Sequence, residues 1–299
     1  MSNNTLIKTL FSEIKSLVKM TFPKWQANKL YRQHFKRNIN WKHPTEFNEK
    51  IRWMQFHADT SKWSLLADKY RVREYLQRLG YGHLLVRLYG VWDKASDIDF
   101  DKLPDSFVLK TNHGYGSVFV IKDKHKADLE NIRKQLTQDL SEKFGIETAE
   151  QHYLRIKPVI VAEELLKQTG EISTSLIDYK FYCINGEPQF CGVMYNRSIK
   201  NHTYDVRLYD NNWDDISHLL ASHTHQGQPI PRPHTFEDMK LFCRKVCKEF
   251  PFIRMDFYEC DGKLYFGEFT FTPAACTGGS LSLQAQELLA NKIKLYNSK

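Results

Sequence analysis

The segment FVLKTNHGYGSVFVIKD, residues 107–123, places a lysine at the end of an apolar run and directly before a glycine loop. Its two apolar runs predict strands at 106–111 and 117–122. The glycines between them permit positive φ and close backbone approach, so successive N–H groups can surround an anion while Lys110 adds a positive charge. These features suit a polyphosphate. On its own, however, a glycine turn in a β-hairpin is the more common explanation.

Helices and connectors dominate the sequence before this segment. The stretch SLLADKYRVREYLQRLGYG, residues 64–82, predicts one strong helix closed by a glycine. A charged helix near 127–144 and an apolar strand at 158–166 follow the glycine loop. We therefore expect a mainly helical N-terminal region at 1–105 and a small α+β lobe at 106–166.

The remaining residues, 167–299, predict a second and larger α+β lobe. One long polar loop interrupts it, and a loop of this length is expected to carry a function or to move. The expected elements are strands near 177–185, 188–195 and 204–209, the polar loop 210–234, a helix at 235–250, the hairpin FIRMDFYECDGKLYFGEF at 252–269 and a terminal helix near 282–293.

The net charge of +8 is concentrated near the N-terminus. Residues 1–50 carry ten Lys or Arg and three Asp or Glu, which leaves the rest of the chain nearly balanced. Faces that bind nucleic acid usually spread basic residues among exposed aromatics, so no nucleic-acid partner is expected. Residues 1–20 predict a basic amphipathic helix, which either packs on the body or lies on an anionic membrane surface.

Targeting and metal-binding signals are weak. The sequence has no run of about 18 apolar residues and no secretory signal, so we expect a cytoplasmic protein, peripheral at the inner membrane face if the basic helix binds lipid. The six cysteines lack C-x-x-C spacing, which argues against zinc and disulfides. His223, His225 and His234 lie in the polar loop, and we expect them to be solvated rather than metal ligands.

Three further stretches carry charges in positions that suit nucleotide chemistry. The strand VIVAEELL ends its apolar run on two glutamates, which can present carboxylates and backbone groups to a purine or ribose. Period-two alternation puts Asp178 and Lys180 on one face of a strand. Carboxylate oxygens are the ligands that Mg²⁺ takes up beside phosphates. The C-terminal hairpin supplies a cation and two carboxylates, at Arg254, Asp256 and Glu268.

Ordinary structural roles compete with these interpretations. Lys69 lies on a helix dense in charge, where a lysine is commonly solvated. Asp178 and Lys180 would also suit an exposed ion pair worth less than about 1 kcal/mol. Glu268 is harder to explain in this way, because an unpaired carboxylate within an aromatic strand is costly to bury.

The order of these parts resembles the ATP-grasp superfamily, in which two α+β lobes clamp ATP. The resemblance covers about residues 65–280. More narrowly, the chain resembles the teichuronopeptide-biosynthesis (TupA-like) branch, which is associated with cell-surface polysaccharides. The motifs that carry the resemblance are DKYRVREYL, LPDSFVLKTNHGYGS, VAEELL, DYKFYCINGEP and RMDFYECDGKLYFGEFTFTPAA. It implies an α+β ATP-grasp fold of two lobes, preceded by the helical region.

The resemblance also implies a role for each matching residue. Phosphate would be bound by Lys69 and Lys110 and covered by a flap at 112–117 that includes His113, Gly114, Gly116 and Ser117. Adenine would meet a hinge of Glu163, Glu164, Leu165 and Leu166, with Asp178 near the ribose. The catalytic cations would be Lys180, facing phosphate or substrate, and Arg254, facing the reacting carbonyl. Magnesium would be held by Asp256 and Glu268, and by Thr270 at a position that is often asparagine, where a hydroxyl is the weaker ligand.

The activity implied by the resemblance is that of an ATP- and Mg²⁺-dependent carboxylate–amine ligase. ATP would phosphorylate a carboxylate, an amine would attack the acyl phosphate, and a cation such as Arg254 would stabilise the oxyanion on the way to the amide. The implied substrates are a carbohydrate or sugar conjugate of a surface polysaccharide and an amino acid or other amine. The alternatives are a sugar kinase with the same ATP clamp, a nucleotide-sugar glycosyltransferase and a non-catalytic scaffold.

Strand parity constrains the metal assignment. Asp256 and Glu268 can share one ion only if their side chains leave the same face of the hairpin. A two-residue turn at 261–262 with regular pairing would put them on opposite faces. We therefore expect a three-residue loop at 260–262, with Gly262 in the left-handed region as a bulge and Arg254 opposite Glu268.

Overall fold

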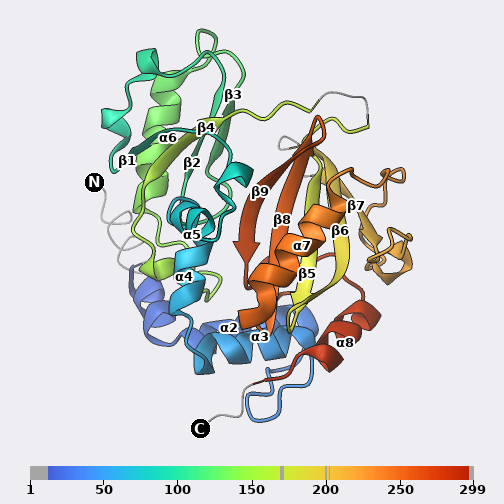
Figure 1. Ribbon diagram of the computed structural model, residues 1–299. Coiled ribbons are helices and arrows are strands. Elements are labelled where there is room, and N and C mark those ends of the chain that lie inside the picture. Colours follow the sequence, from blue (N-terminus) through green and yellow to red (C-terminus); the bar gives the residue numbers. More distant parts are fainter. Residues whose placement is uncertain (1–12, 169–171, 199–200, 202, 296–299) are drawn as a thin grey trace.

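Two antiparallel sheets form the body of the protein (Figure 1). The computed structural model describes residues 13–168, 172–198, 201 and 203–295. The smaller sheet has the order β1-β4-β2-β3 and consists of β1 (Leu88–Trp92), β2 (Phe107–Thr111), β3 (Val118–Ile121) and β4 (Ile160–Glu164). The larger has the order β7-β6-β5-β8-β9 and consists of β5 (Asp178–Ile184), β6 (Glu187–Ser198), β7 (Thr203–Tyr209), β8 (Phe252–Cys260) and β9 (Lys263–Thr270).

Helices cover the sheets and join them at one end (Figure 1). The small sheet packs on α6 (Leu129–Ser141) and the large sheet on α7 (Phe236–Val246), whose Phe236 and Phe242 rings lie 5.6 and 5.3 Å from Phe181 and Phe257. The remaining α-helices are α2 (Pro23–Phe35), α3 (Phe47–His57), α4 (Ser61–Ala67), α5 (Val72–Arg78) and α8 (Leu283–Lys292). This arrangement confirms the predicted α+β class with a helical N-terminal region. Within the described ranges, no helix has the length and apolar character needed to cross a bilayer.

The predicted helix at 64–82 is wrong, because the chain forms two short helices there. Asp68 lies between α4 and α5, and its Oδ1 accepts hydrogen bonds from the backbone N–H groups of Tyr70 (2.9 Å) and Arg71 (3.1 Å). An aspartate that satisfies nearby N–H groups in this way competes with the helix for them. The break leaves Lys69 on a turn, where its N–H donates to the Asn112 carbonyl at 3.1 Å.

The region expected to be helices and connectors also contains one strand. β1 pairs with β4, with Val91 opposite Val161 and Trp92 opposite Ile160. Gly90 disrupts the short apolar pattern, and the pairing register shifts beside it. The small sheet therefore begins before residue 106. The lobe boundaries at 105 and 166 stay a prediction, with β1 added to the smaller lobe.

The C-terminal hairpin differs from the prediction in its loop. Asp256 and Glu268 nevertheless leave the same face of the hairpin, as the metal assignment requires. Its turn has two residues, Asp261 and Gly262, at φ values of 52° and 73°, so Cys260 pairs with Lys263 and the predicted three-residue loop is wrong. The aspartate-glycine pair favours this turn because both positions need positive φ. The extra residue is Gly267, a β-bulge between the pairs Phe257–Phe266 and Asp256–Glu268. The bulge brings Asp256 directly opposite Glu268 and Arg254 opposite Thr270, so the predicted pairing of Arg254 with Glu268 is wrong.

A buried polar junction ties the two lobes to α3. Arg52, which is 1% exposed, donates to the carbonyls of Thr148 (2.8 Å) and Ala149 (3.0 Å) before β4 and to that of Ala275 (2.6 Å) after β9. Hydrogen bonds from a charged donor contribute about 1.5–3 kcal/mol each. One guanidinium thus holds the segment that precedes β4 and the segment that follows β9.

His152 lies beside this junction and is fully buried among Trp63, Tyr153 and Phe271. Neither of its ring nitrogens has a hydrogen-bond partner among the described residues. Burial lowers the pKa of His152 to about 3, from an ordinary value of 6.5. The ring is therefore neutral in the folded protein.

We expect a His152→Phe variant to lose less stability in acid than the parent. As pH falls from 6.5 toward 3, the unfolded parent binds a proton at His152 that the folded parent excludes, so its free energy of unfolding falls by up to about 1.4 kcal/mol per pH unit. The variant has no imidazole at this position and therefore lacks this loss of stability. Glu150, whose pKa is raised by burial, acts in the opposite direction but is common to both proteins. Urea unfolding at about pH 7 and about pH 5 measures the difference, and parallel losses of stability would contradict the assignment.

Candidate active site

One face of the large sheet carries a row of polar side chains over its three adjacent strands β5, β8 and β9. The register places Lys180 opposite Asp256, Asp256 opposite Glu268 and Arg254 opposite Thr270. Directly opposed residues share a face, and residues two apart on one strand share it too. The structure therefore brings six of the predicted residues together on one face, namely Asp178, Lys180, Arg254, Asp256, Glu268 and Thr270.

Asp256 is the centre of this cluster and is 1% exposed. Arg254 binds it through two contacts, Nε to Oδ1 and Nη2 to Oδ2, both 2.7 Å. The Lys180 ammonium lies 2.5 Å from Asp256 Oδ2 and 3.0 Å from Asp178 Oδ2. Burial alone would raise the pKa of the Asp256 carboxyl, but Arg254 and Lys180 offset it and hold that pKa below its ordinary value. The carboxylate is therefore ionised at neutral pH.

Three side-chain oxygens converge on one nitrogen of Arg254. Its Nη2 lies 2.7 Å from Asp256 Oδ2, 3.0 Å from the Thr270 hydroxyl and 3.4 Å from Glu268 Oε1. Two carboxylates and a hydroxyl around one positive charge are a donor set that suits Mg²⁺, so these residues fit the ion. In the described parts of the chain, no three His, Cys, Asp or Glu side chains gather around a metal position. The Thr270 hydroxyl is the third oxygen beside this nitrogen.

The small lobe contributes a second set of charges. Lys110, at the end of β2, lies 2.5 Å from Glu163 on β4, and Arg73 on α5 lies 3.2 Å from the other oxygen of that glutamate. Lys69 connects the two sets, because its ammonium donates to the Gly114 carbonyl at 2.6 Å and lies 3.7 Å from Glu268 Oε2. Burial lowers the pKa of Lys69, with Glu268 opposing the shift and Lys110 adding to it. The site thus lies between the two sheets.

The glycine loop joins β2 to β3 and contains the predicted flap. Gly116 has φ +95°, and a Cβ on Gly114 would lie 2.8 Å from the Phe144 ring. Tyr115 between them is 74% exposed, and Ser117 accepts from Thr111 through its carbonyl. His113 is buried, with Nε2 3.1 Å from the Glu142 carbonyl and Nδ1 without a partner among the described residues. Two backbone positions in this loop therefore require glycine, for different reasons.

The predicted adenine hinge lies where the chain leaves β4. Glu163 is buried in its ion pairs, whereas Glu164 is exposed and its N–H donates to the Arg87 carbonyl at 2.9 Å. Leu165 and Leu166 are half-buried and line a cleft of about 420 Å³ together with Lys122 and residues 173–176. The hinge residues thus divide into two carboxylates with different surroundings and an apolar pair at a cleft.

The residues that fix the position of Lys69 were not predicted in that role, although Asn112 belongs to the predicted flap at 112–117. Asn112 is buried, and its side chain donates to Asp68 Oδ1 (2.8 Å) and accepts from the Val159 N–H (2.8 Å). Arg73 was likewise not singled out, although it belongs to the quoted motif DKYRVREYL. An asparagine directly before the glycine loop and an aspartate directly before Lys69 were the available signals.

All six cysteines are free and buried, and Cys243 lies in the large hydrophobic core. His223, His225 and His234 are exposed, as expected for the polar loop, and none belongs to a metal-binding group within the described residues.

Comparison with known proteins gives a family match and remote structural likenesses. Residues 49–294 match the family model described as TupA-like ATPgrasp. No curated protein matches the sequence. Among solved structures, D-alanine–D-alanine ligase from Bacillus anthracis complexed with ATP is 16% identical with a TM-score of 0.46, over 77% of this chain and 65% of that one. ATP-grasp ligase PsnB, complexed with a phosphomimetic variant of its minimal precursor, Mg and ADP, is 14% identical with a TM-score of 0.44, over 82% and 66%. The chain thus spans less than two thirds of the length of these structures.

A Gly267→Ala variant is expected to disturb the polar cluster from within the hairpin. A Cβ at this bulge would lie 2.9 Å from the Asp256 carbonyl oxygen, so one of the paired strands must shift. We expect a loss of about 1–3 kcal/mol in the free energy of unfolding and weaker Mg²⁺-dependent ADP binding. Calorimetric titration and urea unfolding measure the two effects. The control is Gly262→Asn in the turn, where asparagine tolerates positive φ; equal behaviour of the two variants would contradict the role of the bulge.

Proposed function

Because the chain belongs to the TupA-like ATP-grasp family, we propose that it is an ATP- and Mg²⁺-dependent ligase that joins a carboxylate to an amine. Membership confirms the resemblance drawn from the sequence, and with it the ATP-grasp fold. The observation that carries the proposal is the position of Lys69, whose ammonium contacts the glycine loop of one lobe and Glu268 of the other. A polyphosphate between the lobes would meet cations and metal-binding carboxylates together.

The proposed ATP position follows the distribution of charge. The triphosphate lies between Lys69 and Lys110 on one side and the cluster around Asp256 on the other, with the loop 112–117 over it. The adenine lies at the hinge beside Leu165 and Leu166. These residues and Leu176 are the apolar members of a cleft otherwise lined by polar and basic side chains. Asp178 is then placed for the ribose.

Magnesium would be held by Asp256, Glu268 and Thr270, where it neutralises phosphate charge. Arg254 and Lys180 are now bound to Asp256. With an ion on these oxygens, Arg254 and Lys180 would supply positive charge to phosphate and to the substrate carbonyl. Arg254 then stabilises the negative oxygen that forms when an amine attacks the acyl phosphate. The released products are ADP, phosphate and the amide.

We propose a sugar of a surface polysaccharide, or its precursor, as one substrate and an amino acid or other amine as the second. A sugar kinase would use the same ATP position but would stop at phosphoryl transfer to a hydroxyl. Hydroxylamine separates the two activities, because an acyl phosphate yields a hydroxamate and a sugar phosphate does not. An ADP-release screen of uronic acids, sugar conjugates and amines, run with this trap, identifies the substrates. A nucleotide-sugar glycosyltransferase would show no preference for ATP, and a scaffold would release no ADP.

A Lys110→Ala variant is expected to bind ATP about 10- to 100-fold more weakly, since one charge-assisted contact to phosphate is lost. The fold should persist because Glu163 keeps its contact with Arg73. The control is Lys134→Ala, at an exposed lysine on α6. Calorimetric titration of MgATP measures the affinities, and urea unfolding verifies that both variants are folded. Equal affinity in the two folded variants would exclude Lys110 from the phosphate site.

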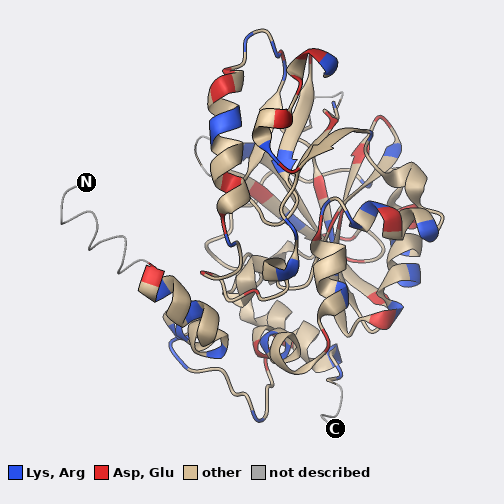
Figure 2. Ribbon diagram, turned by 90° about the vertical axis from the view of Figure 1, so that its left-hand side faces the viewer, with Lys and Arg blue, Asp and Glu red and all other residues tan. Residues whose placement is uncertain are grey.

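We further propose peripheral membrane contact through the N-terminal helix. Residues 1–12 of the predicted helix lie outside the described residues, but the helical turns that follow them lie at the edge of the body (Figure 2). Leu17, Phe22 and Trp25 are 57%, 59% and 52% exposed. Lys19 supports the packed alternative, because it pairs with Glu147 at 2.6 Å. Apolar side chains beside lysines suit an anionic lipid surface.

A Leu17→Glu/Phe22→Glu variant should lose affinity for vesicles of phosphatidylglycerol and phosphatidylcholine, because two apolar contacts become anionic. Each buried side chain of this size is worth about 1.5–3 kcal/mol, so at least a tenfold loss is expected. Co-sedimentation measures binding. The control is Leu241→Glu, at a leucine that is 63% exposed on α7. If the parent does not bind such vesicles, the packed-helix alternative holds.

A further inference from the structure

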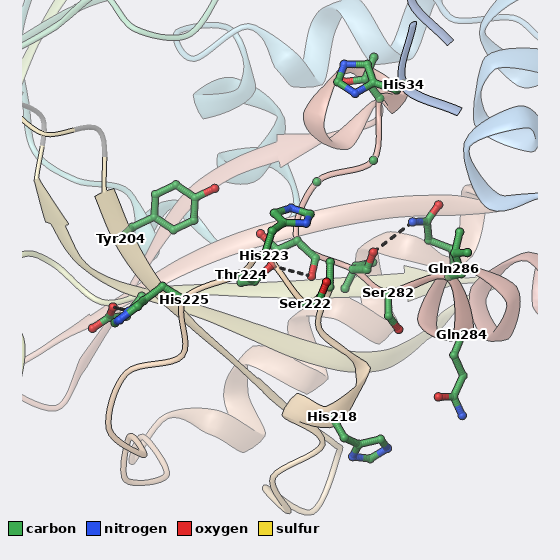
Figure 3. A pocket seen from close by; sticks show the side chains of 18 of the residues that line it. His34, Tyr204, His218, Ser222, His223, Thr224, His225, Ser282, Gln284 and Gln286 are labelled. Carbon is green, nitrogen blue, oxygen red and sulfur yellow. Dashed lines mark hydrogen bonds and ion pairs between the residues drawn. The ribbon is translucent and has the colours of Figure 1, made fainter. Parts of the chain in front are cut away.

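A large cleft lies outside the charged cluster, between the polar loop and the segment before α8. It has a volume of about 1170 Å³. Its lining consists of His34 and Phe35 at the end of α2, parts of β6 and β7, His218 with residues 221–225, and residues 277–284 with Gln286 (Figure 3). Typical small-molecule clefts measure about 300–1,000 Å³, so this one has room for more than one sugar-sized unit. Figure 3 shows Tyr204, His223 and Ser282 around the same space, from three different segments.

Hydrogen bonds hold the wall formed by the polar loop. Asp205 on β7 accepts from Asn196 Nδ2 at 2.8 Å and lies 2.5 Å from His225 Nδ1. Arg207 donates to the Gly227 carbonyl through Nε (2.8 Å) and Nη2 (2.6 Å). A Cβ on Gly227 would lie 2.3 Å from Asp205 Oδ2, so only glycine allows the loop to approach this closely. The long loop is therefore attached to the sheet rather than free.

The opposite wall is attached to the same loop. The Ser282 N–H donates to the Leu219 carbonyl, and the Ala221 N–H donates to the Ser280 carbonyl, both at 2.9 Å. Leu220 and Leu281 form an antiparallel bridge between these hydrogen bonds. These contacts fix the two walls of the cleft relative to each other, as expected of a preformed binding site.

The chemistry of the lining is polar and nearly uncharged. Four of the lining residues are histidines, and no Lys or Arg is among the described residues that line the cleft. Its one carboxylate, on Asp205, is already engaged by Asn196 and His225. The remaining polar groups are hydroxyls and carboxamides, which both donate and accept hydrogen bonds. Tyr204 adds an aromatic ring and is 40% exposed.

We propose that this cleft binds a saccharide chain, with a sugar ring on Tyr204 and its hydroxyls on the imidazoles and hydroxyls of the walls. Many neutral donors and acceptors beside an exposed ring match a polyhydroxylated ligand, whereas a polyanion would require fixed cations. The identification of this chain as the sugar substrate rests on the proposed function.

The cleft is connected to the charged cluster by the chain itself. Asn196, on its rim, directly precedes Arg197, whose Nη2 donates to Asp178 at 3.0 Å. On the other side, the lining residue Thr277 follows Thr270 and Thr272 at the end of β9. A chain of several sugars bound in the cleft can therefore direct one end toward the face that carries Lys180 and Arg254.

The test measures binding without turnover. The probes are the uncharged tetramers of N-acetylglucosamine and of glucose, and a glutamate tetrapeptide. Imidazole NMR signals of His218, His223 and His225 report on the cleft directly, and calorimetry gives the affinity. We expect at least one saccharide to shift these signals, and Tyr204→Ala to weaken its binding about tenfold through loss of the aromatic contact. The control is Tyr70→Ala, at a tyrosine with a similar exposure of 38%.

Each outcome decides the proposal. Signal shifts with a saccharide that are weakened in Tyr204→Ala and unchanged in Tyr70→Ala support it. No shift with any saccharide, equal affinity in both variants, or a response to the glutamate peptide alone would overturn it. MgATP binding is measured on the same samples. Saccharide binding without nucleotide binding would count against the proposed ligase only, and nucleotide binding without saccharide binding would count against the cleft only.

Discussion

The structure depends on the ion cluster around Asp256, a carboxylate that the large sheet buries almost completely. Burying an unpaired charge costs several kcal/mol, so the sheet must supply compensating cations. It does so from the same strand, with Arg254 two residues away on β8, and from the neighbouring strand, with Lys180 directly opposite on β5. Every strand that contributes to this cluster must keep its register, because a slip of one residue would turn the cations to the other face.

Departures from regular helix and strand geometry position several of the side chains that the proposed chemistry uses. The bulge at Gly267 brings Glu268 opposite Asp256, and the break at Asp68 puts Lys69 on a turn beside the glycine loop. Residues 274–276 have φ values of 48–53°, a left-handed run of residues that are not glycine. Such residues cost about 1–2 kcal/mol each, and Arg52 stabilises the run through the Ala275 carbonyl. These departures all lie where the two lobes face each other.

Much of the local structure could be predicted because it follows from side-chain periodicity. The strands around the glycine loop, the helices at 129–141 and 236–246 and the face shared by Asp178 and Lys180 all match their sequence patterns. β1 was missed because a glycine interrupts its short apolar run and its strand pairing comes from β4, about 70 residues away. The helix at 64–82 was predicted as continuous because its apolar periodicity continues across the local turn at Asp68. The contact of Asp68 with Asn112, far along the chain, is not visible in that periodicity.

By itself, the sequence determined the family, the α+β class and the residue types that the candidate site uses, since motif order and alternation are local properties of the chain. It also determined that a two-residue turn with regular strand pairing would put Asp256 and Glu268 on opposite faces. The hairpin therefore needed one extra residue for the two side chains to share a face. Only the tertiary structure decided that a bulge at Gly267, and not the turn, supplies that residue. It alone brought Lys69 to Glu268 and His223 to the wall of a cleft. Such contacts depend on the packing of segments that are distant in the chain, and a local pattern carries no information on distances between them.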